Sequence, residues 1–550
     1  MQQQNYDRAM SVSSDNPYDE VPYPSSSYIE SYPPYFAVVA TLLNVVPPAV
    51  EQCRVLEIGC ASGGNIIPMA ARLPEAQFVG IDLSAQQIAA AQASAATLGL
   101  RNLRLLQLDI LDLPADLGSF DYIIAHGIYS WVPAAVRDGI MQICARHLAA
   151  DGLAYISYNT YPGWHMLGMI RELMLYHTRD AETPAERAEL AIELLDFLAR
   201  PVAEKANPIF RFLSTYAATF REKIEELGPK RDSYLLHDAL EAVNDPVYVH
   251  QFISHAERYG LQYMSEAYFP NLFPSDIDKE TLEALNAIAG SAADTEQLLD
   301  VVRGKTFRQS LLCRQGITID RRVRPERMAT FYIASRAAPL TDTESGLPAD
   351  VEQYRSFDGA TLSTDHPVSK AAMRHLIEIW PRALSFTELL AEGRARAGRS
   401  NVSEAVQQAD AQVLAANLLR AFAYSPNLVT IRTCATPLMP RVTSRPIVDP
   451  LVRLQATQSS EVTSRFHERI QLNSLCRVLA ILCDGSRDHA AIYAAVQQRM
   501  DEGSVEVEVE LEVEPETTTD QIDPAMLEAA VIDEIDRNLR WMAMVALMVG

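Results

Sequence analysis

A glycine-rich turn between an apolar strand and a helix is the sequence feature that most constrains how this chain folds. The run VLEIGCASGGN occupies residues 55–65. Gly59 and Gly63 allow a tight turn and let a ligand approach the backbone. A helix that begins near Asn65 would point its free amide groups at an anionic part of that ligand. Ala61 is a small departure from the commonest pattern, which has glycine there, and the turn alone fits dinucleotide-binding domains too.

Short apolar strands alternate with amphipathic helices around this turn. Such alternation predicts a parallel sheet with helices on both faces, in a Rossmann-like α/β fold. We expect strands at residues 54–58, 77–82, 103–108, 120–125 and 152–158, and helices at residues 36–46, 66–73, 85–98 and 136–148.

Acidic residues end the second and third predicted strands, at the same edge as the glycine-rich turn. Asp82 stands where a carboxylate can accept the hydroxyl protons of a ribose, and Asp109 stands where it can meet an adenine amino group beside Ile110. The motif FDYIIAHGIYSWVP then brings His126 to the end of the fourth strand. Because parallel sheets bind ligands at the carboxyl ends of their strands, this ordered set predicts a nucleoside-containing cofactor.

This stretch resembles the class I S-adenosylmethionine (SAM)-dependent methyltransferase family. Two further segments, YDEVPY at residues 18–23 and SYNTYPGWH at residues 157–165, resemble methyltransferases that carry a methyltransferase regulatory domain. That group includes the rickettsial protein-lysine methyltransferases that modify outer-membrane proteins. The resemblance implies SAM as the cofactor, held by Glu57, Gly59, Cys60, Ala61, Gly63, Asn65, Asp82, Leu83, Asp109, Ile110, His126 and Tyr23.

Aromatic and polar side chains follow the fourth and fifth strands, where methyltransferases place residues that face the methyl group. Aromatic faces attract an alkylammonium ion, and an apolar pocket lowers the pKa of a lysine. We therefore expect a cationic or lysine-like substrate there. The catalytic candidates are Tyr129, His126, Trp131, Tyr158, Asn159 and Trp164, with Tyr161 and His165 beside them. Trp131 and Trp164 have an alternative role, which is to pack a helical insertion onto the sheet, and His165 has that of starting a helix.

Helical patterns replace the alternation after residue 158. We interpret residues 160–245 as a helical insertion inside a methyltransferase domain that spans residues 37–316. The domain resumes with a late pair of strands, of which the last is expected to run antiparallel. Residues 1–36 are rich in tyrosine, serine and proline, and we expect an N-terminal arm whose later part packs over the domain as a lid.

The rest of the chain is predicted to be mainly helical. A connector at residues 317–367 leads to residues 368–550, in which two similar units resemble winged helices. Residues 501–523 contain ten acidic side chains and no basic one. This run is expected to be a solvated loop, or alternatively a docking site for basic segments.

The charge balance constrains the partners of the chain. A formal net charge of −24 argues against nucleic-acid binding, because contact with phosphates needs a basic face. It favours a protein substrate with basic character. Winged helices often bind DNA, but a negatively charged chain is unsuited to that. A scaffold or partner-binding role is therefore the better interpretation of the winged-helix-like units. The oligomeric state stays open.

Seven dispersed cysteines without a CxxC pair predict reduced thiols in a cytoplasmic protein without a zinc site, and we expect no metal. No apolar run is long enough to enter a membrane, and the N-terminus does not resemble a secretory signal.

Three functional hypotheses follow. The first is a protein-lysine N-methyltransferase that acts by in-line methyl transfer to a deprotonated amine. The second is a small-molecule methyltransferase whose helical insertion closes over the substrate. The third is a non-enzymatic SAM-sensing scaffold.

Overall fold

The fold is that of a computed structural model of residues 1–550. The structure describes residues 25–549, except residues 204, 206, 242, 275, 341–347, 349, 436–441 and 509–523. The motif at residues 18–23 and most of the acidic run therefore lie outside the described residues. In the part of the chain that is described, no helix is both long and apolar enough to cross a membrane.

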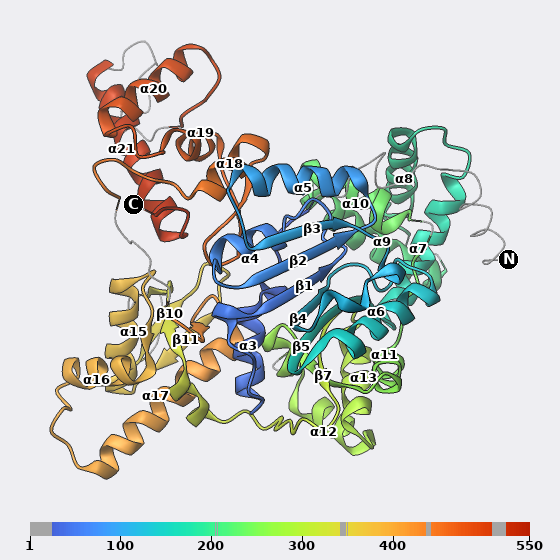
Figure 1. The fold of residues 1–550 in the computed structure, drawn as a ribbon, viewed down its shortest axis with the longest axis horizontal. Helices are drawn as coiled ribbons and strands as arrows, with labels where there is room; N and C mark the ends of the chain where they lie inside the picture. The colour runs from blue at the N-terminus through green and yellow to red at the C-terminus, as the bar shows by residue number, and fades with distance from the viewer. Residues whose placement is uncertain are drawn as a thin grey trace.

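A seven-stranded sheet lies at the centre of the molecule, in the order β3-β2-β1-β4-β5-β7-β6 (Figure 1). The first five strands run parallel, and β7 runs antiparallel to both of its neighbours. The strands are β1 (Arg54–Ile58), β2 (Gln77–Asp82), β3 (Leu103–Gln107), β4 (Phe120–Ala125), β5 (Leu148–Asn159), β6 (Leu261–Glu266) and β7 (Phe307–Arg314). The predicted α/β sheet with an antiparallel last strand is confirmed.

Helices cover both faces of this sheet, because its inner strands carry apolar side chains on both sides. One face packs against α3 (Pro33–Leu42), α4 (Ile66–Arg72) and α5 (Ala85–Thr97). The other face packs against α6 (Ala134–His147) and α11 (Val249–Arg258). Two helices precede β7, α12 (Lys279–Ile288) and α13 (Ala292–Arg303).

A bundle of four helices separates β5 from α11. It comprises α7 (Gly163–His177), α8 (Pro184–Leu198), α9 (Pro208–Glu226) and α10 (Arg231–Tyr234). The bundle has an apolar core of its own, which includes Trp164, Leu195 and Phe220. In Figure 1 it lies on the right, on the side of the sheet away from the C-terminal regions.

A middle region follows β7 and packs on the α3 face of the sheet. Phe422 of its longest helix lies in the same apolar core as Phe36 of α3. The region contains two small sheets, β12-β8-β13 and β11-β10-β9. Its elements are β8 (Tyr332–Ala334), β9 (Ala338–Pro339), β10 (Glu352–Arg355), β11 (Thr361–Thr364), α15 (Pro367–Ile379), β12 (Leu384–Ser385), α16 (Phe386–Arg396), α17 (Glu404–Tyr424) and β13 (Thr430–Arg432).

The C-terminal region has a separate apolar core. Its elements are α18 (Pro450–Gln458), β14 (Glu461–Thr463), β15 (Arg469–Gln471), α19 (Ser474–Leu482), α20 (His489–Asp501) and α21 (Pro524–Met544). The sequence did not predict α18 or the β14–β15 hairpin. Helix α19 begins at Ser474, because the Asn473 side chain accepts the Cys476 N–H (2.7 Å) and caps the helix.

Candidate functional site

The turn between β1 and α4 adopts backbone conformations that most side chains disfavour. Gly59 and Gly63 have φ angles of +69° and +81°. A Cβ atom on Gly59 would lie 2.3 Å from Ile128 Cδ1, so even alanine would clash there. Ala61 takes a left-handed φ of +47° despite its side chain. The turn therefore presents its backbone, with little side-chain cover, at the carboxyl edge of the sheet.

A buried carboxyl group lies beneath this turn at the end of β1. The Asn65 amide donates a hydrogen bond to Glu57 Oε1 (2.6 Å). Within the described residues, Glu57 Oε2 is buried and has no hydrogen-bond partner. Burial raises the pKa of Glu57 to about 8, with a smaller contribution from Asp82. An unpaired buried oxygen at this edge is suited to receive a cationic group of a ligand.

The acids at the ends of β2 and β3 lie along the same edge. Asp82 accepts the backbone N–H groups of Ala61 (2.8 Å) and Ser84 (2.9 Å), so it ties the glycine-rich turn to the next strand. Asp109 accepts the Leu111 N–H (2.8 Å) and is otherwise exposed.

Two leucines beside these acids are unusually open to solvent. The side chains of Leu83 and Leu111 are 58% and 55% exposed, and Ile110 between the two acids is half-buried. Exposed apolar side chains offer a flat ring a surface to pack against. Asp109 directly precedes Ile110 and Leu111, as an adenine contact would require.

The described part of the N-terminal arm packs directly over the glycine-rich turn. Ser25 Oγ accepts the Gly64 N–H (2.7 Å), and the Tyr28 N–H donates to Asn65 Oδ1 (3.1 Å). Ser31 Oγ also bonds the Asn65 amide. A Cβ atom on Gly64 would lie 2.4 Å from the backbone of Ser25, so the close approach depends on glycine. Tyr23, expected to contact the cofactor, lies outside the described residues.

A column of aromatic rings stands at the end of β4. The His126 ring stacks on Tyr28 with 3.6 Å between centroids, and Tyr155 lies on its other side at 5.8 Å. His126 Nδ1 is 2.8 Å from the Tyr155 hydroxyl, which accepts a hydrogen bond from the Gln309 amide (3.1 Å). Burial lowers the pKa of His126 to about 3, so the ring is neutral near pH 7 and is a poor proton acceptor. Proton acceptance by the catalytic candidate His126 is therefore not supported, whereas contact with a ligand is.

Glu30 adds a carboxyl group to this column. Its pKa is raised, chiefly by burial, and the Gln309 amide and Arg469 oppose that rise. After burial, the charge of Glu30 is the next largest cause of the raised pKa of Tyr155, so the Glu30 carboxyl group lies near the stacked rings.

The C-terminal region reaches this same place through the β14–β15 hairpin. His467 Nε2 lies 2.8 Å from Asn65 Oδ1, and because an amide oxygen carries no proton, His467 must donate. The His467 ring also stacks on Tyr32, with 4.6 Å between centroids. Arg469, at the end of the hairpin, lies over the Tyr28 ring at 5.5 Å. Three parts of the chain that are distant in sequence thus meet at Asn65.

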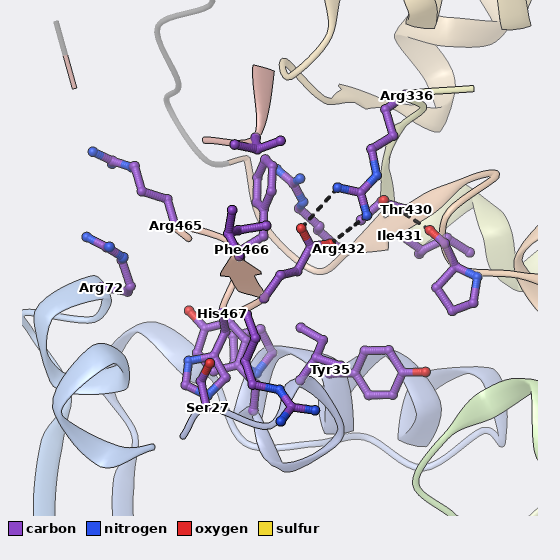
Figure 2. A pocket seen from close by; sticks show the side chains of 18 of the residues that line it. Ser27, Tyr35, Arg72, Arg336, Thr430, Ile431, Arg432, Arg465, Phe466 and His467 are labelled. Atoms are coloured by element: carbon purple, nitrogen blue, oxygen red, sulfur yellow. Dashed lines mark hydrogen bonds and ion pairs between the residues drawn. The ribbon is translucent and has the colours of Figure 1, made fainter. Parts of the chain in front are cut away.

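A cavity of about 1280 Å³ opens beside the aromatic column. The arm and α4 form one wall, the middle region forms a second, and the C-terminal region forms a third. Figure 2 shows Arg72 and Arg465 side by side, and Arg432 and Arg336 near Phe466. Tyr28 and Glu30 line the same cavity, so it leads to the aromatic column.

Two of the predicted catalytic residues point away from this cavity. Tyr129 and Tyr158 belong to the core on the opposite face of the sheet, where both pack against Phe252 of α11. The Tyr129 hydroxyl bonds His255 Nδ1 (2.6 Å), and the Tyr158 hydroxyl bonds Ser310 Oγ (3.1 Å). Neighbouring residues of a strand face opposite sides of a sheet. Candidates that are close together in the sequence can therefore lie on different faces of the sheet. Their positions do not support a catalytic role.

The other candidates also pack within the protein. Trp131 meets Trp164 edge to face at 6.4 Å, and both belong to the core of the helical bundle, in agreement with the alternative role. Asn159 is buried and donates to Asn244 Oδ1 (2.9 Å). Tyr161 stacks on His165 at 4.0 Å, at the start of α7. These side chains do not line the cavity beside the aromatic column.

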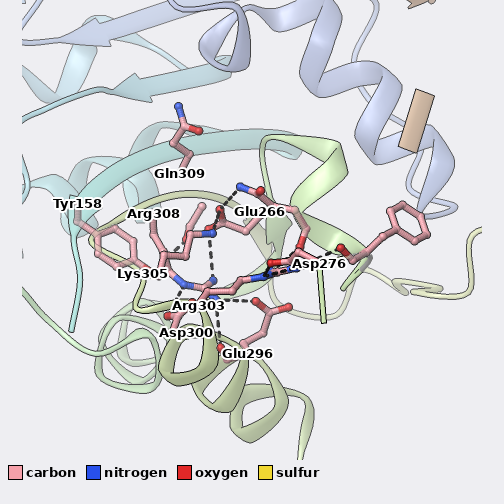
Figure 3. Close-up of polar contacts among 12 residues, drawn as sticks. Tyr158, Glu266, Asp276, Glu296, Asp300, Arg303, Lys305, Arg308 and Gln309 are labelled. Carbon is pink, nitrogen blue, oxygen red and sulfur yellow. Dashed lines mark hydrogen bonds and ion pairs between the residues drawn. The ribbon is translucent and has the colours of Figure 1, made fainter. Parts of the chain in front are cut away.

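Strand β7 explains how Gln309 reaches the aromatic column. Its neighbour Arg308 points the opposite way, into a buried ionic cluster (Figure 3). There Arg308 Nε lies 2.7 Å from Asp300, and its terminal nitrogens approach Glu296 (2.8 Å) and Glu266 (3.3 Å). The cluster fixes β7 between β6 and α13, and so fixes the position of Gln309.

Several residues of the site were not foreseen. Tyr155 could have been found by alternation, since it precedes Ser157 and Asn159 on the same face of β5. The tyrosine-rich composition of the arm could have pointed to Tyr28. No sequence pattern points to His467 or Arg469, because their contribution depends on how distant parts of the chain pack.

The residues at this edge fit SAM. A buried unpaired carboxyl oxygen of Glu57 suits its ammonium group, Asp82 its ribose, and the exposed leucines near Asp109 its adenine. The glycine-rich turn suits its carboxylate.

Comparison with protein families and known proteins agrees with this fit. Residues 55–152 match the description "Methyltransferase domain", and residues 231–314 match "Predicted methyltransferase regulatory domain". Residues 444–544 match "PKMT, C-terminal winged helix domain". This match confirms the predicted winged-helix character for residues 444–544.

Two uncharacterized proteins of Rickettsia prowazekii (strain Madrid E) are similar in sequence. One is 32% identical over 506 residues, which cover 90% of this chain and 88% of that protein. The other is 38% identical over 241 residues, which cover 44% of this chain and 94% of that protein.

The solved structure of PKMT2 from Rickettsia typhi in complex with AdoHcy is similar in fold. It is 25% identical, with a TM-score of 0.81 over 96% of this chain and 100% of that chain. AdoHcy is SAM without its methyl group, so the predicted cofactor, family resemblance and enzyme class are confirmed.

Proposed function

This chain belongs to the class I SAM-dependent methyltransferases that carry a methyltransferase regulatory domain and a PKMT winged helix domain, and we propose that it methylates lysine side chains of a protein substrate. The observation that carries this proposal is the likeness to the Rickettsia typhi PKMT2, a protein-lysine methyltransferase by its name, over the whole of that chain. The cavity supports it, because a long lysine side chain can enter along the wall that ends at the aromatic column.

The aromatic column is the proposed lysine site. The stacked rings of Tyr28, His126 and Tyr155 offer apolar surface that both packs against the lysine methylenes and disfavours the charged ammonium ion. Glu30 stands beside them with a raised pKa, so it is suited to pair with the ammonium group and accept its proton. The proposed acceptor is thus Glu30, in place of His126.

SAM supplies a methyl group on a positively charged sulfur, and the lysine nitrogen displaces that sulfur in line. The lysine nitrogen must use its lone pair to form the new N–C bond, so its proton has to leave first. The protein's part is to hold the amine beside the end of β4, to exclude water and to take up that proton. Asn65 orders the site by binding Glu57, the arm and the C-terminal hairpin at once.

The basic character expected of the partner corresponds in this proposal to the lysine itself. All seven cysteines are unpaired, which fits a reducing compartment, and we propose a cytoplasmic location.

The test is methylation of proteins with tritiated SAM, followed by mass spectrometry of the labelled material. Methyl groups on lysine nitrogens are expected. Label found only on oxygen atoms, or only on small metabolites, would exclude the proposal and favour a small-molecule methyltransferase. Complete absence of turnover with intact SAM binding would favour a SAM-sensing scaffold.

Glu30 provides a test at the level of mechanism. Glu30→Gln keeps the shape of the side chain but cannot accept a proton, so kcat should fall by about 100-fold at neutral pH. SAM affinity, measured by calorimetry, should stay the same. The control is Glu226→Gln at an exposed carboxyl group at the end of α9, which should have full activity. Full activity of Glu30→Gln would remove Glu30 from the mechanism.

A further inference from the structure

The two ends of the cavity differ in charge. Near the aromatic column the wall carries Glu30 together with Arg469, whereas farther along it carries the guanidinium groups of Arg72, Arg432 and Arg465. These arginines come from α4, from β13 and from the loop between β14 and β15. Three regions of a chain with a net charge of −24 thus place positive charge on one wall.

Arg432 lies at the centre of this basic wall. Its guanidinium stacks on the Phe466 ring, with Cζ 3.9 Å from the centroid. Both terminal nitrogens are buried, and neither has a hydrogen-bond partner among the described residues. Burial lowers the pKa of Arg432 to about 10, which leaves it charged near pH 7. A buried cation without partners is costly, and such a group calls for an anion to bind.

Arg72 and Arg465 lie beside each other and share one carboxylate. Asp449 is 2.5 Å from Arg72 Nη1 and 3.9 Å from Arg465 Nη1. The Arg72 side chain is only 9% exposed. In the described part of the chain, three further nitrogens are buried and have no hydrogen-bond partner, namely Nε and Nη2 of Arg72 and Nε of Arg465. Two guanidinium groups therefore share one carboxylate at this wall.

The remaining acids of the cavity offset this excess only in part, although the charge of Glu468 also acts on Arg432. Glu468 forms a bidentate ion pair with Arg336, in which each carboxylate oxygen lies 3.1 Å from one guanidinium nitrogen. Glu51 and Glu75 are exposed to solvent, where their charges are screened. The unpaired donors remain at Arg72, Arg432 and Arg465.

We propose that this basic wall binds the carboxylate of an acidic side chain in the polypeptide whose lysine is methylated, so that the enzyme selects lysines with an acidic residue nearby in sequence. The inference rests on the proposed function, because it places the acidic residue in the same segment as the target lysine. Guanidinium groups bind carboxylates through paired, charge-assisted hydrogen bonds, and the free Nη groups of Arg432 and Arg72 supply them.

A polypeptide explains the cavity better than a free anion does. Small-molecule pockets measure about 300–1000 Å³, and this cavity, of about 1280 Å³, is larger. A free anion would use only the basic wall, whereas a segment with a lysine and an acidic residue would use both ends.

The length of α4 gives the expected spacing, because Asn65 at its start bonds the Tyr28 N–H and Arg72 at its end belongs to the basic wall. Arg72 lies seven residues after Asn65 along α4, which corresponds to about 10 Å at the rise of an α-helix. An extended chain covers about 10 Å in about three residues. We therefore expect the strongest selection for an acidic residue at about this distance from the lysine.

The experiment uses the full chain and short synthetic peptides with one lysine in an uncharged background. One peptide carries aspartate about three residues from the lysine, a second carries asparagine there, and further peptides move the aspartate along the sequence. A parallel set has norleucine in place of lysine, so that binding is measured by fluorescence anisotropy without turnover. Inorganic phosphate is the probe for a free anion.

The expected result is that the aspartate peptides bind at least about tenfold more tightly than the asparagine peptides. Arg432→Gln and Arg465→Gln should abolish this preference while SAM affinity, measured by calorimetry, shows that the fold is intact. The matched control is Arg420→Gln, at an exposed arginine of α17 outside the cavity, which should keep the preference.

Equal binding of the aspartate and asparagine peptides would overturn the inference, as would a preference that survives both arginine variants. Phosphate that binds as tightly as the aspartate peptide would overturn it in favour of a free-anion site. The norleucine peptides separate this inference from the proposed function. If they show the preference and the lysine peptides are not methylated, the basic wall stands and lysine methylation fails.

Discussion

Among single residues of the cofactor site, Glu57 has a carboxyl group whose two oxygens lie in different surroundings. Oε1 accepts a hydrogen bond from Asn65, whereas Oε2 is buried without a partner in the described residues. The pKa of this group is raised to about 8, chiefly by burial. Without cofactor, folded protein therefore keeps a proton on Glu57 at a pH where an ordinary carboxyl group has lost it.

This proton predicts a pH dependence of SAM binding. A cationic ammonium beside Oε2 favours the ionised carboxylate, so below pH of about 8 binding should release about one proton. Affinity should then rise with pH up to that value and level off above it. Calorimetric titrations in buffers of different ionisation enthalpy measure the release directly. Glu57→Gln should bind SAM more weakly and release no proton from this position, and an unchanged release would show that another group is responsible.

Residues of the site divide into those that local pattern reveals and those that it does not. The glycine-rich turn and the acids Asp82 and Asp109 follow strand ends, so the sequence places them at one edge. Tyr158 and Tyr155 are separated by three positions on β5, and alternation puts them on opposite faces of the sheet. The sequence alone does not show which face of the sheet carries the ligand, so it could not select Tyr155 over Tyr158.

At the scale of elements, the ionic cluster around Arg308 holds together the last part of the sheet domain. It joins β7 to α13 through Asp300 and Glu296, and to β6 through Glu266. The Arg308 side chain is only 2% exposed, so its carboxylate partners depend on it for compensation of their charge.

Arg308→Met should therefore lower the free energy of unfolding by about 3–5 kcal/mol, because three partly or fully buried carboxylates lose their common partner. Chemical denaturation with urea measures this difference. The control is Lys279→Met, where the side chain is 89% exposed and pairs loosely with Glu283 (3.5 Å), and which should change stability little. If the two variants lose equal stability, the cluster contributes no more than a surface ion pair.

Elements differ in how well the sequence predicts them, for a physical reason. The β/α alternation is predicted because each strand and helix is long enough to show its own period of apolar residues. Strands β14 and β15 have three residues each, too few to show a period, and they pair with each other at the end of a longer loop. That hairpin nevertheless carries His467 and Arg469 to the cofactor site.

At the scale of the whole molecule, the C-terminal region completes a site that belongs to the sheet domain. His467 and Asn65 are 402 residues apart in sequence, yet they share a buried hydrogen bond (2.8 Å). Asn65 in turn holds Glu57 and the arm. No local pattern could predict this contact, because it arises only when the sheet domain and the C-terminal region pack together. We infer from these contacts that the winged-helix region is coupled to cofactor binding.

This coupling predicts that a change in the C-terminal region weakens SAM binding. His467→Ala removes the donor to Asn65 Oδ1 and the ring that stacks on Tyr32, so Asn65 loses part of what orients it toward Glu57. Loss of a buried hydrogen bond of this kind should raise the Kd for SAM by about tenfold. His467→Gln retains an N–H donor and should restore part of the affinity.

The matched control for this coupling is His489→Ala, at a histidine of the same region that is 43% exposed and pairs with Asp536 (3.2 Å) away from the cavity. It should leave SAM affinity unchanged. Burial holds the pKa of His467 near 3, so the neutral ring donates at any pH used, and the effect of His467→Ala should not vary between pH 6 and pH 8. Equal affinities for SAM in His467→Ala and His489→Ala would show that the C-terminal region touches the site without contributing to it.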